Sequence, residues 1–287
     1  MMQIADRDRD EWPEPGTRLD LIADAQRVGL DLSERLFTEW RRLGLLGAPQ
    51  RRRSGAHGQE LALFSAEQRV LFGAIARDRV RGVSNAWLAA HPVNAWLNFG
   101  DGWVSIKQLR AALTTAVGNP RLSQRVAAIT AKTLVDQIDV NNASVQARAY
   151  FKKEVTEQLW RGRIDETRLL GAVTRVFQPG GLVIIRGADD ASLHIDAVTT
   201  WLVATMTAVR KSKSITDEQL YEARLQHLAS LPGYLQGQAE RQAQGGPQLA
   251  HLYADMAPKD LAMQAVGTLL LLVGLNIQRD RKAAGAP

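Results

Sequence analysis

The sequence predicts a mainly α-helical protein that contains only a small amount of β-structure. Apolar residues recur at three- and four-residue spacing along most of the 287 residues, which is the period of an amphipathic helix. The alternating pattern of a strand is confined to short segments at Leu61–Phe64 and Leu182–Ile185. With 45% hydrophobic residues the chain can bury a full core, and its length favours two domains over one.

Charge and composition narrow the classes of function. The formal net charge of +6 and a pI near 9.8 favour polyanionic partners. The chain has no cysteine, which excludes disulfides, thiolate metal sites and cysteine nucleophiles and agrees with a cytoplasmic, nucleoid-associated location. Residues 1–10 are charged, unlike a secretory signal, and the apolar run Val266–Ile277 is shorter than the roughly 20 residues of a membrane span. We therefore expect no membrane partner.

The N-terminal third begins with a tail and two short helices. Residues 1–18 are charged and contain Pro13, Pro15 and Gly16, so we expect a disordered tail. Apolar residues at helical spacing from Leu19, a break at Gly29 and a second helical pattern from Ser33 predict two helices joined by a tight turn. These helices open a domain that we expect to span residues 19–118.

A basic hairpin and a third helix follow. The segment 47–58 is rich in arginine and glycine and leads into the alternating Leu61–Phe64, which together predict a β-hairpin. Ser65 and Gln68 have the spacing of a capping box, in which each side chain satisfies a free backbone N–H at the start of the helix. We expect this helix to end near Arg81.

An irregular segment dense in aromatic residues is predicted within 82–118. Its C-terminal part has an amphipathic helical pattern, with Ile106, Leu109, Ala112 and Leu113 on one face. Its first half crowds together Trp87, His91, Trp96, Asn98, Phe99 and Trp103. Such a group forms either a pocket for a small organic effector or a small core that fixes the hairpin. The candidate pocket residues are Trp87, Trp96, Phe99 and Trp103.

The rest of the chain is predicted to be helical almost throughout. Residues 119–235 form the expected domain for dimerisation or effector binding, and Asn119-Pro120 is a favourable helix start. A second capping box, Thr216–Gln219, opens its last helix. Residues 236–248 are Gln-, Gly- and Ala-rich and predict a linker, and 249–287 contain a final apolar helix that must be enclosed.

The order of two short helices and a hairpin predicts an N-terminal winged helix-turn-helix with a small β wing. In this fold the second helix presents polar side chains to base edges in the major groove, while the wing holds phosphates. Positive charge is expected along both elements, and the sequence has it there. The candidate DNA-contacting residues are Ser33, Arg35, Thr38, Glu39, Arg41, Arg42, Arg51, Arg52, Arg53 and His57.

Two stretches in this region carry a family resemblance. Leu32–Leu46 has an aromatic residue at Trp40 and ends in Gly-Leu-Leu, and the basic Gln50–Arg53 is followed by Leu63-Phe64-Ser65. These stretches resemble the recognition helix, exit turn and wing of MerR-type regulators. The likeness covers roughly residues 19–113. It implies a transcriptional regulator whose partner is double-stranded DNA.

The sequence also departs from the MerR pattern. Thr38 stands where the family usually has Arg, Arg41 where it has an acidic residue, and Gln59-Glu60 near its wing Tyr-Arg. No long heptad run follows, so the family's coiled-coil dimer is not predicted. Because one module contacts few base pairs, we expect a homodimer formed by other helices, and no cofactor.

Two other classes of protein stay open beside the regulator. The same module serves architectural proteins of mobile elements, such as excisionase-like, partition or replication accessory factors that assemble in several copies on DNA. A basic helical bundle whose arginines are solvated, acting as an adaptor for other proteins, would bind no nucleic acid.

No catalytic or metal site is expected. The acidic candidates are Asp136 with Asp139, Glu154 with Glu157, and Asp189-Asp190 with His194 and Asp196. The first two pairs have the helical spacing typical of solvated faces, and Asp189-Asp190 is typical of a helix cap. Five scattered histidines give no metal-ligand spacing, and Gly180-Gly181 lacks the Lys-Ser/Thr of a phosphate-binding loop.

Overall fold

The computed structural model describes residues 12–54, 59–119, 123–136, 143–177, 182–183, 193–244 and 258–285. The chain divides into an N-terminal unit, Met1–Ala116 with Ala257–Val266, and a C-terminal unit, Val117–Met256 with Gly267–Pro287. Most of the described residues are helical, which confirms the mainly α class.

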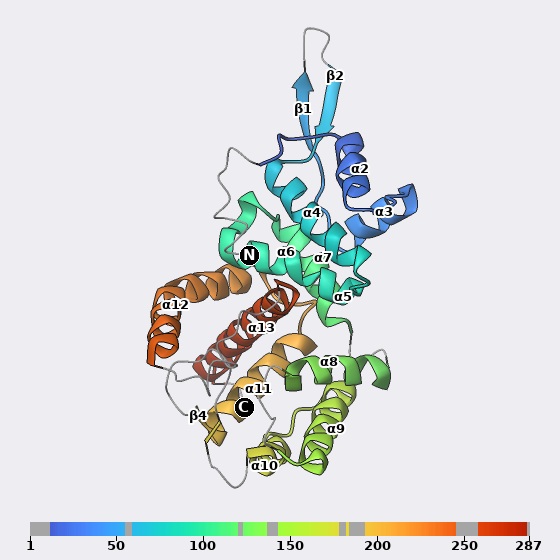
Figure 1. Cartoon of the computed structure of the whole chain (residues 1–287). Coiled ribbons are helices and arrows are strands. Elements are labelled where there is room, and N and C mark those ends of the chain that lie inside the picture. Colours follow the sequence, from blue (N-terminus) through green and yellow to red (C-terminus); the bar gives the residue numbers. More distant parts are fainter. Residues whose placement is uncertain are drawn as a thin grey trace. The chain divides into compact units, whose positions relative to one another are not determined.

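The N-terminal unit contains short helices and a two-stranded antiparallel hairpin, which projects from the helices in Figure 1. Its elements are α2 (Arg18–Arg27), α3 (Glu34–Arg42), β1 (Gln50–Ser54), β2 (Gln59–Leu63), α4 (Ala66–Val80), α5 (Asn85–Leu88), α6 (Ala90–Phe99), the 3-10 turn η2 (Gly100–Gly102) and α7 (Ile106–Val117). The expected pair of helices, the hairpin and the third helix are all present at the predicted places.

Local sequence signals explain how α2 and α3 begin and end. Thr17 precedes α2, and its backbone N–H and hydroxyl both donate to the Asp20 carboxylate. Gly29 adopts φ +81 in the turn after α2, a left-handed conformation that glycine tolerates without strain. The Ser33 hydroxyl accepts a hydrogen bond from the backbone N–H of Leu36 and so caps α3. The break at Gly29 and the cap at Ser33 therefore fix the two-helix turn.

The tail prediction is wrong for the residues just before α2. Gly16 pairs with Phe64 by two backbone hydrogen bonds of 2.9 and 2.7 Å, which adds an isolated bridge at the base of the hairpin. The rings of Trp12 and Trp103 pack in a T-shaped arrangement, with ring centroids 5.3 Å apart. Long-range contacts order this segment despite its composition. Residues 1–11 lie outside the described part of the chain.

The predicted irregular segment within 82–118 is mostly helical. It forms α5, α6 and α7, and Leu109, Ala112 and Leu113 lie on the buried face of α7 as predicted. The prediction failed for α5 and α6 because α6 is buried along nearly its whole length, so its sequence lacks the apolar and polar alternation that marks a surface helix.

The C-terminal unit is built from helices with one short hairpin. Its elements are α8 (Gln124–Asp136), α9 (Val145–Arg161), α10 (Glu166–Phe177), β3 (Leu182–Val183), β4 (Leu193–His194), α11 (Ile195–Arg210), α12 (Asp217–Gln244) and α13 (Pro258–Ala283), whose first turns belong to the N-terminal unit. The strand expected at 182–185 is present and pairs antiparallel with β4. The capping box of α12 is confirmed by two hydrogen bonds between Thr216 and Gln219, of 3.1 and 3.2 Å.

Two boundaries in this unit differ from the prediction. The helix predicted to start at Asn119-Pro120 is α8, which begins at Gln124. The Ser123 hydroxyl accepts from the N–H of Val126 at this helix start. The stretch 236–248, expected to be a linker, is helical as far as Gln244, because α12 continues through Pro232. Its many Ala and Gln residues have good helix propensity, which compensates for the few apolar anchors.

The final helix is enclosed against α11. A Cβ added to Gly274 of α13 would lie 2.0 Å from the carbonyl oxygen of Ala204, so only glycine permits this close backbone approach. By length and composition Leu261–Ala283 would suffice to cross a membrane, which corrects the shorter span expected from sequence. Of its most apolar window, 61% is buried inside the protein, as in the core helix that the sequence predicts.

Candidate nucleic-acid interface

Helix α3 has one buried apolar face and one exposed polar face. Phe37 and Trp40 are buried, and the rings of Trp40 and Phe72 of α4 pack with their centroids 5.6 Å apart. The helix is short, so these two aromatic side chains are its main anchors. The candidate residues on the opposite side are exposed: Ser33, Arg35, Thr38, Arg41 and Arg42.

The arginines of this face are available to an external anion. Within the part of the chain that the structure describes, the guanidinium groups of Arg35, Arg41 and Arg42 form no hydrogen bond or ion pair. The nearby acids are engaged elsewhere: Glu34 pairs with Arg18, and half-buried Glu39 accepts from Asn85 at 3.4 Å. The face therefore carries uncompensated positive charge.

The hairpin, which follows α3 along the chain, contains three more arginines. Arg51, Arg52 and Arg53 occupy the middle of β1, opposite Ala62, Leu61 and Glu60 of β2. Arg51 is exposed. The candidate residue His57 lies outside the described residues.

Close backbone contact fixes the end of α3 against α7. Gly44, directly after the helix, adopts φ +76, and a Cβ there would lie 2.3 Å from the backbone nitrogen of Ala112. Thr115 of α7 donates its hydroxyl to the carbonyl of Leu43 at 2.9 Å. The Gly-Leu-Leu turn is thus a packing element that orients α3.

A buried amide network replaces half of the predicted capping box at α4. The Ser65 hydroxyl accepts from the N–H of Gln68 at 3.3 Å, as predicted. The Gln68 side chain does not return to Ser65: its carbonyl accepts from the N–H of Gly47 at 2.8 Å, and its amide donates to Gln108 and to the carbonyl of Trp103. Gln68 therefore joins the turn before the hairpin to α7, a role that local spacing could not reveal.

Two of the aromatic residues proposed as an effector pocket, Phe99 and Trp103, pack on each other. Trp96 is fully buried and donates its indole N–H to Asp101 at 2.9 Å. Phe99 stacks on Trp103 with ring centroids 4.8 Å apart. Trp87 is half-buried on α5. These contacts favour the small core over the effector pocket, and the pocket stays a prediction.

A buried ionisable pair in this unit is not apparent from the sequence. Nε2 of His91 in α6 lies 2.9 Å from Oδ2 of Asp78 in α4, and both residues are buried. Burial lowers the pKa of His91 below its ordinary value, although the Asp78 carboxylate opposes this shift. The pair links α4 to α6, and the Asp78 carboxylate also accepts from the exposed Arg81 at 3.3 Å.

The structure describes only some of the acidic residues considered from the sequence. Glu154 is buried and accepts from Arg168 at 2.8 Å, so the prediction of a solvated face is wrong for this residue. Asp139 and Asp189-Asp190 lie outside the described residues. Among the described residues no group of three or more His, Asp or Glu side chains could hold a metal ion.

Comparison with known proteins adds no relative. No protein-family model matches the chain, and no curated protein or solved structure matches it.

Proposed function

We propose that the N-terminal unit is a winged helix-turn-helix that binds double-stranded DNA, and that the protein is a sequence-specific transcriptional regulator acting as a homodimer. The observation that carries this proposal is the exposed face of α3, with Arg35, Arg41 and Arg42 unpaired among the described residues. A recognition helix needs this division, because one side must be held by its domain while the other enters the major groove.

The spacing of the arginines suits a groove. Arg35 and Arg42 are seven residues apart, which is two helical turns, so they lie on the same side of α3 and roughly 10 Å apart along its axis. This distance is close to the rise of about three base pairs along one strand. One arginine can then fork onto a guanine while the other binds a base or phosphate farther along.

The hairpin supports the same proposal by its place and charge. It follows α3 directly, and Arg51, Arg52 and Arg53 supply positive charge for phosphates next to the groove. The resemblance to MerR-type regulators, in which recognition helix and wing follow each other in this order, agrees with this assignment of roles.

The test is DNA binding by an Arg35→Ala/Arg42→Ala variant of the full chain. A duplex selected from a random pool with the wild-type protein is titrated by fluorescence anisotropy, and the matched control is Lys152→Ala/Lys153→Ala, which removes two exposed charges from α9. We expect the α3 variant to bind the selected duplex at least about tenfold more weakly and to discriminate less against unrelated duplexes. Equal affinities for both variants would refute the recognition role of α3.

Footprinting then separates the regulator from the architectural class. A homodimer should protect one spaced inverted repeat and then saturate, because two symmetric modules read two half-sites. A footprint that lengthens as protein concentration rises would contradict the regulator and indicate an architectural factor assembling along DNA.

A further inference from the structure

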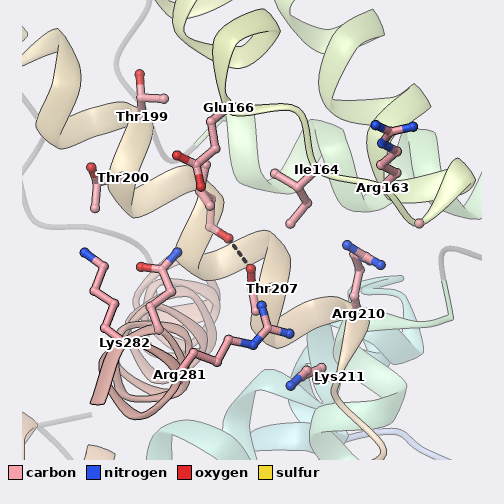
Figure 2. Close-up of a pocket in the computed structure, with 13 residues that line it drawn as sticks. Arg163, Ile164, Glu166, Thr199, Thr200, Thr207, Arg210, Lys211, Arg281 and Lys282 are labelled. Atoms are coloured by element: carbon pink, nitrogen blue, oxygen red, sulfur yellow. Dashed lines mark hydrogen bonds between the residues drawn. The ribbon is translucent and has the colours of Figure 1, made fainter. Parts of the chain in front are cut away.

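The C-terminal unit contains a cavity of about 610 Å³ with a strongly basic lining. Three segments build it: the turn between α9 and α10, one side of α11, and the last turns of α13, as Figure 2 shows. All three belong to the same compact unit. None of them was singled out by the sequence, because the basic residues come from positions up to 119 residues apart, Arg163 to Lys282.

The lining has a large excess of positive charge. Its five basic residues are Arg163, Arg210, Lys211, Arg281 and Lys282, against the single carboxylate of Glu166. Within the described residues the charged groups of Arg163, Lys211, Arg281 and Lys282 form no hydrogen bond or ion pair. Cations gathered around one hollow repel each other, and an anion bound between them would relieve that repulsion.

The hydrogen-bonding groups of the lining also favour an acceptor-rich ligand. The hydroxyls of Thr199, Thr200 and Thr207 donate to carbonyls of their own helix at 2.8 to 2.9 Å, so their protons are already used. The side-chain donors left for a ligand are the ammonium and guanidinium groups and the amide of Gln278. Phosphoryl oxygens suit such donors well, since a guanidinium group can bind two of them through bidentate hydrogen bonds.

Size and shape point to a small organic molecule. A volume of about 610 Å³ is within the range of roughly 300–1,000 Å³ typical of small-molecule sites and exceeds what a lone phosphate ion would fill. Ile164 and Val203 give part of the lining an apolar character. We propose that this cavity binds a small molecule that carries two or more phosphoryl groups.

A simpler role for some of these residues is stabilisation of helix ends. Arg210 and Arg281 lie in the last turns of α11 and α13, where positive charge interacts favourably with the helix dipole. Arg163 directly follows Gly162, the C-cap of α9, and can have the same role there. Stabilisation of helix ends predicts no ligand binding. The two readings therefore give different results in a titration.

The experiment is isothermal titration of the full chain with inorganic tripolyphosphate and with ATP, in the absence of divalent cations. The cavity variant is Lys211→Ala/Arg281→Ala, whose altered side chains are at least partly exposed, and the control is Lys152→Ala/Lys153→Ala. We expect saturable binding to the wild type and control, with one site per chain, and affinity lowered about tenfold or more in the cavity variant. ATP should bind at least as tightly as tripolyphosphate if the apolar part of the lining holds an organic group.

Three results would overturn the proposal: no saturable binding by the wild type, equal weakening in both variants, or loss of duplex-DNA affinity in the cavity variant that matches its loss of tripolyphosphate affinity. The last result would assign the cavity to the nucleic-acid backbone. The proposal does not depend on DNA binding by the N-terminal unit, because phosphate binding by the Arg35→Ala/Arg42→Ala variant should be unchanged.

Discussion

Asp24 of α2 and Arg69 of α4 form a bidentate ion pair, with Oδ2 to Nε and Oδ1 to Nη2 distances of 2.9 Å each. Both side chains are only 10% exposed. Arg69 also donates to the carbonyl of Glu14 at 2.6 Å, so it holds the chain before α2 as well as the helix itself. This pair fixes the first helix of the proposed DNA-binding domain against its support.

Replacing Arg69 by Met should destabilise the protein by about 3 kcal/mol, because the nearly buried Asp24 carboxylate then keeps the exposed Arg27 as its partner but loses the buried one. Chemical denaturation measures the effect. The double variant Asp24→Asn/Arg69→Met should lose less than the sum of the two single changes. As a control, Arg161→Met removes an exposed partner of Glu157 and should cost under about 1 kcal/mol. Equal losses for Arg69→Met and Arg161→Met would contradict the role given to the buried pair.

Gly44→Ala should cost more stability than Gly29→Ala. Both glycines have positive φ, +76 and +81, so each substitution adds about 1–2 kcal/mol of backbone strain. Gly44 alone lies against backbone, whereas a Cβ at Gly29 meets nothing within 4 Å. We expect Gly44→Ala to exceed its control by at least about 1 kcal/mol in the free energy of unfolding. Two equal losses would show that α3 does not depend on close contact with α7.

Trp40→Ala should impair folding. The side chain is fully buried, and its removal should cost about 3–5 kcal/mol. Its indole nitrogen has no hydrogen-bond partner among the described residues, so Trp40→Phe should cost much less. Thermal unfolding followed by circular dichroism distinguishes the variants. A Trp40→Ala protein with unchanged stability and lost DNA binding would mean that Trp40 lies on the DNA-facing side.

The buried His91 should make stability depend on pH. Its folded pKa lies below the ordinary value of 6.5, so the unfolded chain binds the proton more readily. The free energy of unfolding should therefore fall as pH decreases from about 6.5 towards the folded pKa. His227, whose pKa is also lowered by burial, adds a dependence of the same sign.

Urea denaturation at about pH 7.5 and about pH 5.5 measures this dependence. In His91→Gln the free energy of unfolding should decrease less between the two pH values than in the wild type. The contribution of His227 should remain. An identical decrease in both proteins would show that His91 is protonated equally in the folded and unfolded states.

The sequence predicts the elements of the N-terminal unit better than their contacts. The break at Gly29, the cap at Ser33 and the helix start at Ser65 act over three or four residues, so spacing alone locates them. The partners of Gln68 and Gly44 lie 40 and 68 residues away, at Gln108 and Ala112. Such contacts arise from packing and leave no local pattern.

The two candidate binding surfaces likewise differ in whether local sequence spacing or long-range packing forms them. The exposed arginines of α3 follow from helical period and from the apolar anchors Phe37 and Trp40. Spacing along the sequence does not predict the basic cavity, because Arg163 and Arg281 line it together only when α9, α11 and α13 pack in the folded chain. The prediction of a solvated face is wrong for Glu154 for a related reason: its partner Arg168, which allows its burial, lies on the next helix.

The hairpin arginines should control the salt dependence of DNA affinity. Each phosphate neutralised by the protein steepens the fall of log affinity with log salt by about 0.9. Replacing Arg51, Arg52 and Arg53 together by alanine should therefore weaken binding to all duplexes and flatten this slope. The control variant, Arg125→Ala/Lys152→Ala/Lys153→Ala, removes three exposed charges from the C-terminal unit and should keep the slope.

The most direct test of the account is the salt dependence of duplex binding by the full chain, measured by fluorescence anisotropy for the wild type and the hairpin variant. The account predicts a steep linear fall in log affinity for the wild type and a slope shallower by about one to three for the hairpin variant. Absence of salt-dependent affinity in the wild type, or equal slopes in the two proteins, would contradict it.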